Sequence, residues 1–276
     1  MYSFLFNNDS PQASRALEKK VLLEYFPVNV ERIEKLITNR TKLIFISHVT
    51  CTTGQCFPIK EIGELAKSRG IWFAVDGAQA AGTMVMDVLQ SNVDFYAFSG
   101  HKWVLGPKRT GVLFVRKDLL DTVKPTVVGA YSDGGYDIRK GTFKLNPTAQ
   151  RYEYATQNEA LFHGLGKAVD FITTIGLNRI HNHNCTLAER FYHELQQIPE
   201  VEILSPEEKE YRSSIISFKV KGRNFRQLGK YLVDRDIRVR VVPEAGLNGV
   251  RISFHIYNNE KEIERLISQL KEYIKA

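Results

Sequence analysis

The stretch IWFAVDGAQAAGTMVMDVLQSNVDFYAFSGHKW, residues 71–103, contains two short apolar runs that each end in polar residues. The runs are IWFAV (71–75) and DFYAF (94–98), and apolar segments of this length are typical of strands buried on both faces. The polar residues that follow them are Asp76, Gln79, Ser99, His101 and Lys102. Parallel strands bring their carboxyl ends to one edge of a sheet, where ligands bind in open α/β folds. We therefore expect these side chains to converge.

The residues on either side of this stretch extend the pattern. Thr41–Val49 (TKLIFISHV) and Gly111–Val115 (GVLFV) are further strand candidates. Pro58 suits the first position of a helix that follows Thr41–Val49, and Gly70 suits its end. Strands that are apolar along their length and separated by helices predict an α/β fold, with a mostly parallel sheet covered on both faces.

The second half of the chain has a different character. Residues 118–155 are irregular and rich in Gly, Asp, Lys and Tyr, and long irregular segments in a compact domain are often functional. Helices are expected at 157–175 and 177–198. A small α+β unit is expected next, with strands at 215–220, 237–242 and 249–256 and helices at 225–235 and 260–274. We predict two domains, 1–175 and 176–276, with the boundary near Gly176.

Composition and charge exclude several classes of protein. The chain has 276 residues and a net charge of +7, and its 43% hydrophobic and 25% charged residues match an ordinary soluble protein. The lysines and arginines are scattered, so no nucleic-acid partner is expected. No apolar run reaches the ~18 residues of a membrane helix. Met1 to Ser10 lack the pattern of a signal peptide, so we expect a cytoplasmic protein without a membrane partner.

The three cysteines, Cys51, Cys56 and Cys185, predict neither a disulfide framework nor a zinc site, because they are odd in number in a long chain. The stretch HNHNC (181–185) resembles a metal site locally. A tetrahedral site needs four converging ligands, however, and the stretch also fits the polar face of a helix. No metal is therefore expected.

Several motifs in order along the chain resemble the class V aminotransferase superfamily of pyridoxal-phosphate (PLP) enzymes. They are DGAQ (76–79), SGHKW (99–103), GPKRTGVLFV (106–115), RYEYATQN (151–158) and GVRISFHIYN (249–258). The superfamily includes cysteine desulfurases, isopenicillin N epimerase-like proteins and related lyases. The resemblance runs through most of the chain. It implies PLP fold-type I, with a partial large domain, a small C-terminal domain and pyridoxal 5'-phosphate as cofactor.

The resemblance also implies a role for each site residue. Lys102 would bind the cofactor covalently and carry protons, and Asp76 would pair with the ring nitrogen so that the ring can accept electrons. Gln79 would hydrogen-bond the phenolic oxygen. Arg251 would bind a substrate carboxylate, which suits its bidentate guanidinium. The residues that would bind the phosphate are Ser99, His101 and, often across a dimer interface in this family, Thr156.

Taken singly, these residues have simpler explanations. An aspartate after a buried strand is often a helix cap. A lone lysine there is usually a surface charge, and Arg251 could be an exposed charge on a sheet. The combination of motifs in one order favours the cofactor site.

The chain departs from the family at its start. Family members carry a longer N-terminal section with a Gly-rich phosphate loop at a helix N-terminus and an aromatic residue that stacks on the cofactor ring. Neither is found here, and His48 is not expected to replace the stacking residue because it lies within a strand. We therefore expect weakened or absent cofactor binding. A fragment, a naturally short protein and a fold completed by another chain all remain open.

Three further departures concern single positions. Desulfurases of the group carry a nucleophilic cysteine before the terminal strand, whereas Arg240–Gly246 contains none, so we expect a chain that is not a thiol-dependent cysteine desulfurase. Cys51 stands where desulfurases often have asparagine, and a small buried residue is its simpler explanation. Arg109 and Ala155 stand where the family often has glycine.

The expected function is that of a PLP-dependent enzyme, in a homodimer, that deprotonates an amino acid at Cα. Epimerase, lyase or aminotransferase chemistry would each fit this description. The alternative is a non-catalytic or incomplete fragment that serves as a partner or scaffold subunit. The presence of the whole set of motif residues argues against a long-decayed site.

Overall fold

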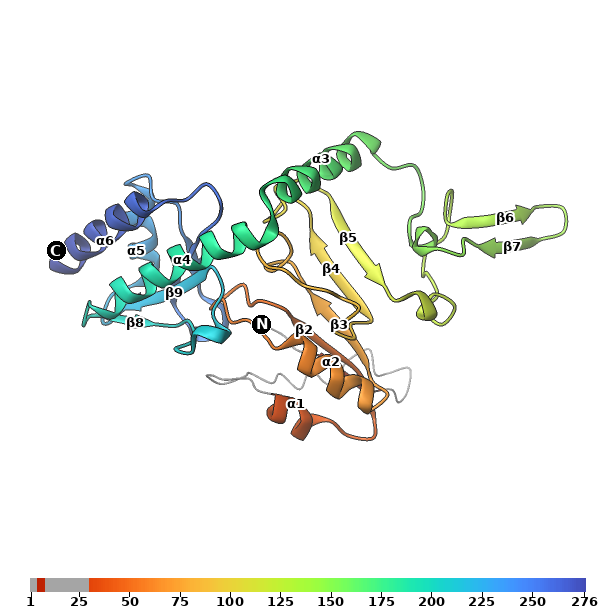
Figure 1. The fold of residues 1–276 in the computed structure, drawn as a ribbon, viewed down its shortest axis with the longest axis horizontal. Helices are drawn as coiled ribbons and strands as arrows, with labels where there is room; N and C mark the ends of the chain where they lie inside the picture. Colours follow the sequence, from red (N-terminus) through yellow and green to blue (C-terminus); the bar gives the residue numbers. More distant parts are fainter. Residues whose placement is uncertain (1–3, 8–29) are drawn as a thin grey trace.

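The computed structural model describes residues 4–7 and 30–276 (Figure 1). Most of Met1 to Ser10, from which the cellular location was argued, lies outside these residues. The strands are β1 Phe4–Asn7, β2 Thr41–Ser47, β3 Trp72–Asp76, β4 Phe95–Ser99, β5 Gly111–Val115, β6 Asp133–Asp137, β7 Thr142–Leu145, β8 Val201–Ile203, β9 Ile215–Val220, β10 Arg240–Val242 and β11 Gly249–Ser253. The α-helices are α1 Val30–Leu36, α2 Ile59–Ser68, α3 Glu159–Ile175, α4 Leu177–Gln196, α5 Phe225–Val233 and α6 Glu260–Lys275.

The central sheet is five-stranded, in the order β1-β2-β3-β4-β5. β2, β3 and β4 run parallel, with Ser47 paired to Asp76 and Asp76 to Ala97. This confirms the predicted α/β class and places the ends of the three strands at one edge. The fourth predicted strand, β5, instead runs antiparallel to β4. The segment from Gly100 to Thr110 is too short for the crossover that a parallel neighbour needs, which is a dozen or more residues.

The core of this part lies between the sheet and α2. The helix begins at Ile59, one residue after Pro58, and turns Ile62 and Ala66 toward buried residues of β3 such as Phe73 and Val75. All four of these side chains are almost completely buried, so the apolar periodicity read from the sequence is the face that packs.

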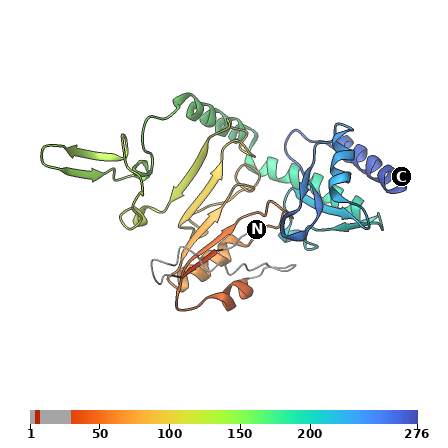
Figure 2. The same ribbon diagram turned by 180° about the vertical axis from the view of Figure 1, so that it is seen from behind.

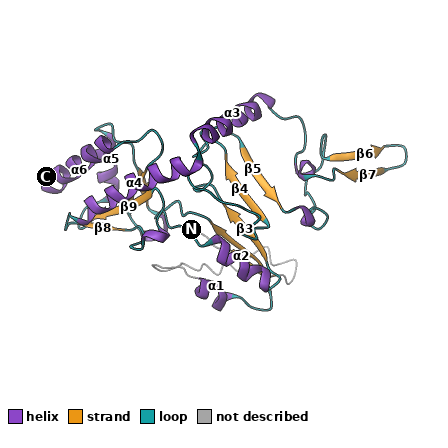
Figure 3. Ribbon diagram, viewed as in Figure 1, coloured by secondary structure: helices purple, strands orange, loops and turns teal. Residues whose placement is uncertain are grey.

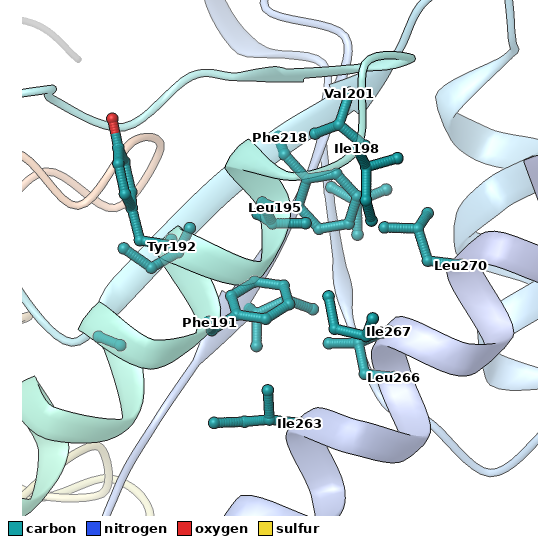
Figure 4. Close-up of a cluster of buried hydrophobic side chains, with 14 of the residues drawn as sticks. Phe191, Tyr192, Leu195, Ile198, Val201, Phe218, Ile263, Leu266, Ile267 and Leu270 are labelled. Atoms are coloured by element: carbon teal, nitrogen blue, oxygen red, sulfur yellow. The ribbon is translucent and has the colours of Figure 1, made fainter.

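The C-terminal part is a four-stranded antiparallel sheet, in the order β10-β11-β9-β8, packed against α4, α5 and α6 (Figure 3). Its core centres on Phe191 of α4, whose ring lies 5.9 Å from that of Phe218 and 5.6 Å from that of Phe254, measured between centroids. Figure 4 shows this cluster, with Leu266 and Ile267 of α6 facing the same interior. β8 was not predicted, since a three-residue strand has no usable periodicity. The domain boundary near Gly176, which separates α3 from α4, remains a prediction.

The segment predicted as irregular, 118–155, contains a hairpin of β6 and β7. Figures 1 and 2 show this hairpin projecting from the end of the molecule opposite the C-terminal part. Its exposed side chains include Tyr136, Ile138 and Phe143, with Ile138 84% exposed. Strands without a buried face lack the alternation of apolar and polar residues by which strands are recognised, so the hairpin escaped prediction.

Candidate active site

The first predicted motif, DGAQ, forms a tight turn directly after β3. The Gly77 amide donates to the Ala97 carbonyl at 2.7 Å, so the turn begins in register with β4. Oδ1 of Asp76 accepts from the Ala78 amide at 2.9 Å. Asp76 therefore caps its own turn, as the simpler explanation had it. Its other carboxylate oxygen has no hydrogen bond within residues 4–7 and 30–276, and can still serve a ligand.

The second motif, SGHKW, forms a closed turn after β4. The Gly106 amide donates to the Gly100 carbonyl at 2.8 Å, and the Leu105 amide donates to the Lys102 carbonyl at 3.0 Å. Gly100 has no room for a side chain, since a Cβ there would lie 2.3 Å from Oγ1 of Thr110. Lys102 is exposed on this turn, and in the described part of the chain its amine has no hydrogen bond or ion pair. The amine is thus available to a carbonyl group.

A hydrogen bond between side chains joins the two motifs. Nε1 of Trp103 donates to Oε1 of Gln79 at 2.9 Å. With the pairing of Asp76 and Ala97, this contact confirms that the ends of β3 and β4 form one edge. Asp76, Gln79 and Lys102 all stand at or just after the strand ends that form this edge, and their shared role stays a prediction.

Arg251 of β11 reaches the loop that follows β2. Its Nη1 donates to the carbonyl of Cys51 at 2.8 Å, and Nη1 of Arg240 donates to the same oxygen at 3.3 Å. Burial, and then the nearby Arg240 charge, lower the pKa of Arg251. The alternative that Arg251 is simply an exposed charged residue on a sheet is therefore excluded. Its Nε is buried and, among the described residues, without a partner, so it can donate to a ligand.

The same loop, residues 50–56, is fixed to the C-terminal sheet by side chains that bond to its carbonyls. Oγ of Ser217 donates to Thr52 at 2.5 Å, and Oγ of Ser205 donates to Thr53 at 2.6 Å. At Gly54, where φ is +72°, a Cβ would lie 2.0 Å from the Ile215 carbonyl oxygen. Only glycine fits so close an approach. The C-terminal part thus holds Arg251 against the loop that follows β2.

The predicted phosphate-binding residues are less closely assembled. Ser99 ends β4 and His101 is exposed on the turn beside Lys102. Thr156 lies in an exposed segment before α3, and within the described ranges it makes no hydrogen bond to any other predicted site residue. Its role as a phosphate ligand stays a prediction.

Sequence reasoning missed a buried pair behind Asp76. Nδ1 of His48 lies 3.1 Å from the hydroxyl of Tyr96, and each residue is 5% exposed. Burial lowers the pKa of His48 to about 4, so its imidazole is neutral. Burial, and then the Asp76 charge, raise the pKa of Tyr96. The ring of Tyr96 packs against Gly77 of the turn, where a Cβ would lie 2.1 Å from its Cε1. His48 is buried beside Tyr96, which agrees with the expectation that it does not stack on a ligand. A polar residue in the apolar strand DFYAF was the available signal.

The neutral His48 predicts a loss of stability in acid. Its pKa is about 4 in the folded chain and ~6.5 when unfolded, so between these values the unfolded chain binds the extra proton. The contribution of His48 to the free energy of unfolding is fully present above pH ~6.5. It is lost as the pH drops to about 4, which lowers the free energy of unfolding by up to about 3 kcal/mol. Urea unfolding of wild type and His48→Asn at several pH values measures this, and the variant should lose most of the slope. His193→Asn, at an exposed histidine, should keep it, and an unchanged slope in His48→Asn would contradict the assignment.

Two departures from the family share a backbone explanation. Arg109 and Ala155 both have φ of +68°, in the left-handed region where glycine is favoured. The family's glycines at these positions suit that conformation, and here the chain adopts it with a side chain present.

Arg109→Gly is therefore expected to raise the free energy of unfolding by up to about 1 kcal/mol, because it removes left-handed strain. The matched control is Lys108→Gly, at an exposed residue with ordinary φ, which should lower it by about 0.5–1 kcal/mol. Thermal unfolding of the three chains gives the comparison. A loss of stability in Arg109→Gly equal to that of the control would refute the strain argument.

Across residues 4–7 and 30–276, no group of three or more His, Cys, Asp or Glu side chains is arranged to hold a metal ion. In the same residues no helix combines the length and hydrophobicity needed to cross a membrane. His181 and Cys185 lie on α4, with the thiol 3.7 Å from the ring nitrogens.

Comparison with known proteins identifies the family. The sequence matches the family Aminotransferase class-V over residues 17–266. The chain belongs to this family. A probable cysteine desulfurase of Borreliella burgdorferi is 35% identical over 263 residues, which are 90% of this chain and 61% of the relative. A probable cysteine desulfurase of Pyrococcus abyssi is 31% identical over 246 residues, which are 85% of this chain and 60% of that relative. The chain thus spans about three fifths of the length of these relatives.

Similar solved structures support the same family assignment. The apo cysteine desulfurase of Thermococcus onnurineus NA1 has a TM-score of 0.83 at 33% identity, over 90% of this chain and 63% of that one. The cystine C–S lyase C-DES, solved with its reaction product cysteine persulfide, has a TM-score of 0.80 at 27% identity. The match covers 87% of this chain and 64% of C-DES. A mutant of C-DES, at 28% identity, carries glycine covalently linked to its PLP cofactor. These neighbours confirm fold-type I for this family member.

The comparisons correct one expectation. We expected that the chain is not a thiol-dependent cysteine desulfurase, because Arg240–Gly246 lacks a cysteine. That expectation is wrong, since the relatives and the Thermococcus structure carry the name cysteine desulfurase. The missing residue in one short loop was a weak argument, because a thiol can be supplied from another segment of the fold. Cys51, whose carbonyl both arginines contact, lies close to the predicted substrate clamp.

Proposed function

We propose that this chain carries the cofactor- and substrate-binding centre of a PLP-dependent cysteine desulfurase. The carrying observation is the hydrogen bond from Trp103 to Gln79, which joins the carboxylate turn and the lysine turn into one site. The donor set fits pyridoxal phosphate. Within the described residues, Asp76 keeps one carboxylate oxygen, Gln79 its NH₂ and the exposed Lys102 its amine without a partner, and all three residues stand at or just after the ends of β3 and β4. The family and its named relatives support the same assignment.

When bound, pyridoxal phosphate supplies an electron sink that makes the Cα proton of an amino acid acidic. Asp76 would hold the proton on the ring nitrogen through its second carboxylate oxygen, and Gln79 would donate to the phenolic oxygen. Ser99 and His101 would donate to the phosphate. The Lys102 amine would bind the cofactor covalently and would carry the Cα proton of the substrate.

Arg251 selects an amino acid by its carboxylate. Its guanidinium is fixed by the Cys51 carbonyl, and its buried Nε, which has no partner in the described part of the chain, is available to an incoming anion. A second cation, Arg240, points at the same carbonyl, and it also pairs with Glu244. Two guanidinium groups at this point favour an anionic ligand.

The test is the reaction of the purified chain with L-cysteine in the presence of PLP. The proposal predicts a visible absorption band that borohydride bleaches, in contrast to the weakened binding expected from the sequence, and formation of alanine with sulfur bound to a thiol. Sulfide should appear only when a reductant is added. A band without release of sulfur from L-cysteine would overturn the desulfurase assignment and leave the cofactor site standing. The absence of any band would overturn both.

C–S lyase chemistry is a second candidate, favoured by the structural likeness to the cystine C–S lyase C-DES. In that reaction the sulfur leaves from Cβ by elimination, and the remaining carbon skeleton is hydrolysed to pyruvate and ammonia. The two products distinguish the candidates, because a desulfurase forms alanine and a lyase forms pyruvate. Cystine is the substrate with which to test the lyase.

We further propose a cytoplasmic homodimer. The exposed apolar side chains of the β6–β7 hairpin, such as Tyr136 and Ile138, suit a contact with a second copy. Thr156 follows the hairpin in sequence, and in this arrangement it would serve the partner's phosphate. Sedimentation of wild type and Ile138→Asp tests the contact, which predicts a dimer that the variant weakens.

A further inference from the structure

Trp103, directly after the predicted cofactor lysine, is a buried tryptophan, and the single polar atom of its side chain faces Gln79. Trp103 is 8% exposed, and its Nε1 lies 2.9 Å from Oε1 of Gln79. An indole N–H can only donate, so the atom that faces it must be the amide oxygen. The NH₂ of Gln79 therefore faces away from the indole. Among the residues described, no other side chain bonds to this amide and could reverse it.

The tryptophan is itself held by a second buried residue. Nε2 of His255 lies 2.9 Å from the Trp103 carbonyl, and the two rings meet edge-on, 5.3 Å between centroids. On its other side, Nδ1 of His255 lies 3.2 Å from Nδ2 of Asn184. His255 and Asn184 are each 1% exposed.

These contacts determine the tautomer of His255. A carbonyl can only accept, so Nε2 carries the proton, and Nδ1 then accepts from the amide of Asn184. Burial lowers the pKa of His255 against the opposing effect of the Trp103 carbonyl, which favours this neutral form. The hydrogen bonds therefore form a chain with one direction. Asn184 of α4 donates to His255, His255 donates to the Trp103 carbonyl, and the Trp103 indole donates to Gln79.

We propose that Trp103 is a positioning residue that sets the orientation of the Gln79 amide, with its NH₂ toward the cofactor's phenolic oxygen. This inference rests on the proposed function. A donated hydrogen bond stabilises the anionic form of that oxygen, whereas a reversed amide would present its carbonyl and oppose the charge. The indole thus tunes the acidity of the lysine-bound cofactor without touching it.

The first measurement needs no cofactor. The chain contains two tryptophans, Trp103 and the 39% exposed Trp72, so its NMR spectrum has two indole N–H signals. We expect the Trp103 signal to exchange with solvent at least tenfold more slowly than the Trp72 signal, and to lose part of this protection in Gln79→Ala. An equally slow exchange in Gln79→Ala would show that burial alone protects the indole, and would overturn the proposed contact.

The second measurement is a visible pH titration of the cofactor-loaded chain. Trp103→Phe keeps an aromatic ring against His255 but removes the N–H. We expect it to raise the titration midpoint by about one pH unit, through the loss of a donated hydrogen bond. Trp72→Phe, the same substitution away from the site, should leave the midpoint unchanged. In a Gln79→Ala background, Trp103→Phe should have no further effect.

The outcomes separate the two proposals. If Trp103→Phe binds cofactor and titrates like wild type, or shifts the midpoint equally without Gln79, the positioning role is refuted while the proposed function stands. If wild type shows no cofactor band, the proposed function fails and the positioning role fails with it. Thermal unfolding of Trp103→Phe is the folding control, and the NMR comparison is made on wild type and Gln79→Ala, in which Trp103 is intact.

Discussion

Replacement of Lys102 with alanine is expected to abolish covalent capture of the cofactor. The amine is exposed on a closed turn and, in the residues that the structure describes, has no competing partner. Loss of proton transfer by a positioned group typically costs about 10²–10⁴-fold in rate, so sulfur release from L-cysteine should fall by at least this factor. Borohydride reduction followed by peptide mapping measures the capture, and timed assays of alanine measure the rate.

Lys108→Ala is the matched control, because Lys108 is an exposed lysine a few residues further along. It should retain both the reducible band and the rate. A band in Lys102→Ala that borohydride still fixes to the chain would assign the covalent bond to a different lysine. A band that cannot be fixed, together with a lost rate, is the expected result.

Phe191→Ala should cause the largest loss of stability, about 3–5 kcal/mol in the free energy of unfolding. Its ring is fully buried in α4 and meets the rings of Phe218 and Phe254 edge-on. The neighbouring β9 and β11 strands are hydrogen-bonded in a sheet and cannot easily close the cavity that the missing ring would leave. Urea unfolding monitored by circular dichroism measures the effect.

The control for this substitution is Val233→Ala on α5 of the same part of the chain, at a side chain that is 52% exposed. It should change stability by no more than about 0.5 kcal/mol. A small effect of Phe191→Ala, similar to that of the control, would mean that the cluster around α4 contributes little to the stability of the fold.

Much of the fold follows from local patterns. The apolar runs at 41–49, 71–75 and 94–98 became β2, β3 and β4, because runs rich in β-branched and aromatic residues favour strands. Burial of both faces did not follow in the described residues, since Trp72 of β3 is 39% exposed. The helices α2, α3, α4 and α6 begin and end within two residues of their predicted bounds, since amphipathic periodicity and end signals are properties of adjacent residues. The antiparallel direction of β5 and the strands β6, β7 and β8 did not follow, because they depend on pairing between segments.

The site, like the fold, has features that follow from local sequence and others that depend on contacts between distant segments. The sequence by itself determined the class of fold and predicted that Asp76, Gln79 and Lys102 lie at one edge of the sheet, because Asp76 and Gln79 stand at and after the end of one strand and Lys102 stands after the end of its parallel neighbour. Only the tertiary structure decided which partners these residues have. Arg251 reaches the Cys51 carbonyl across 200 residues of chain, and His255 reaches the Trp103 carbonyl across 152. Local periodicity carries no information about contacts of that span, since they exist only once the C-terminal sheet has packed against the loop that follows β2.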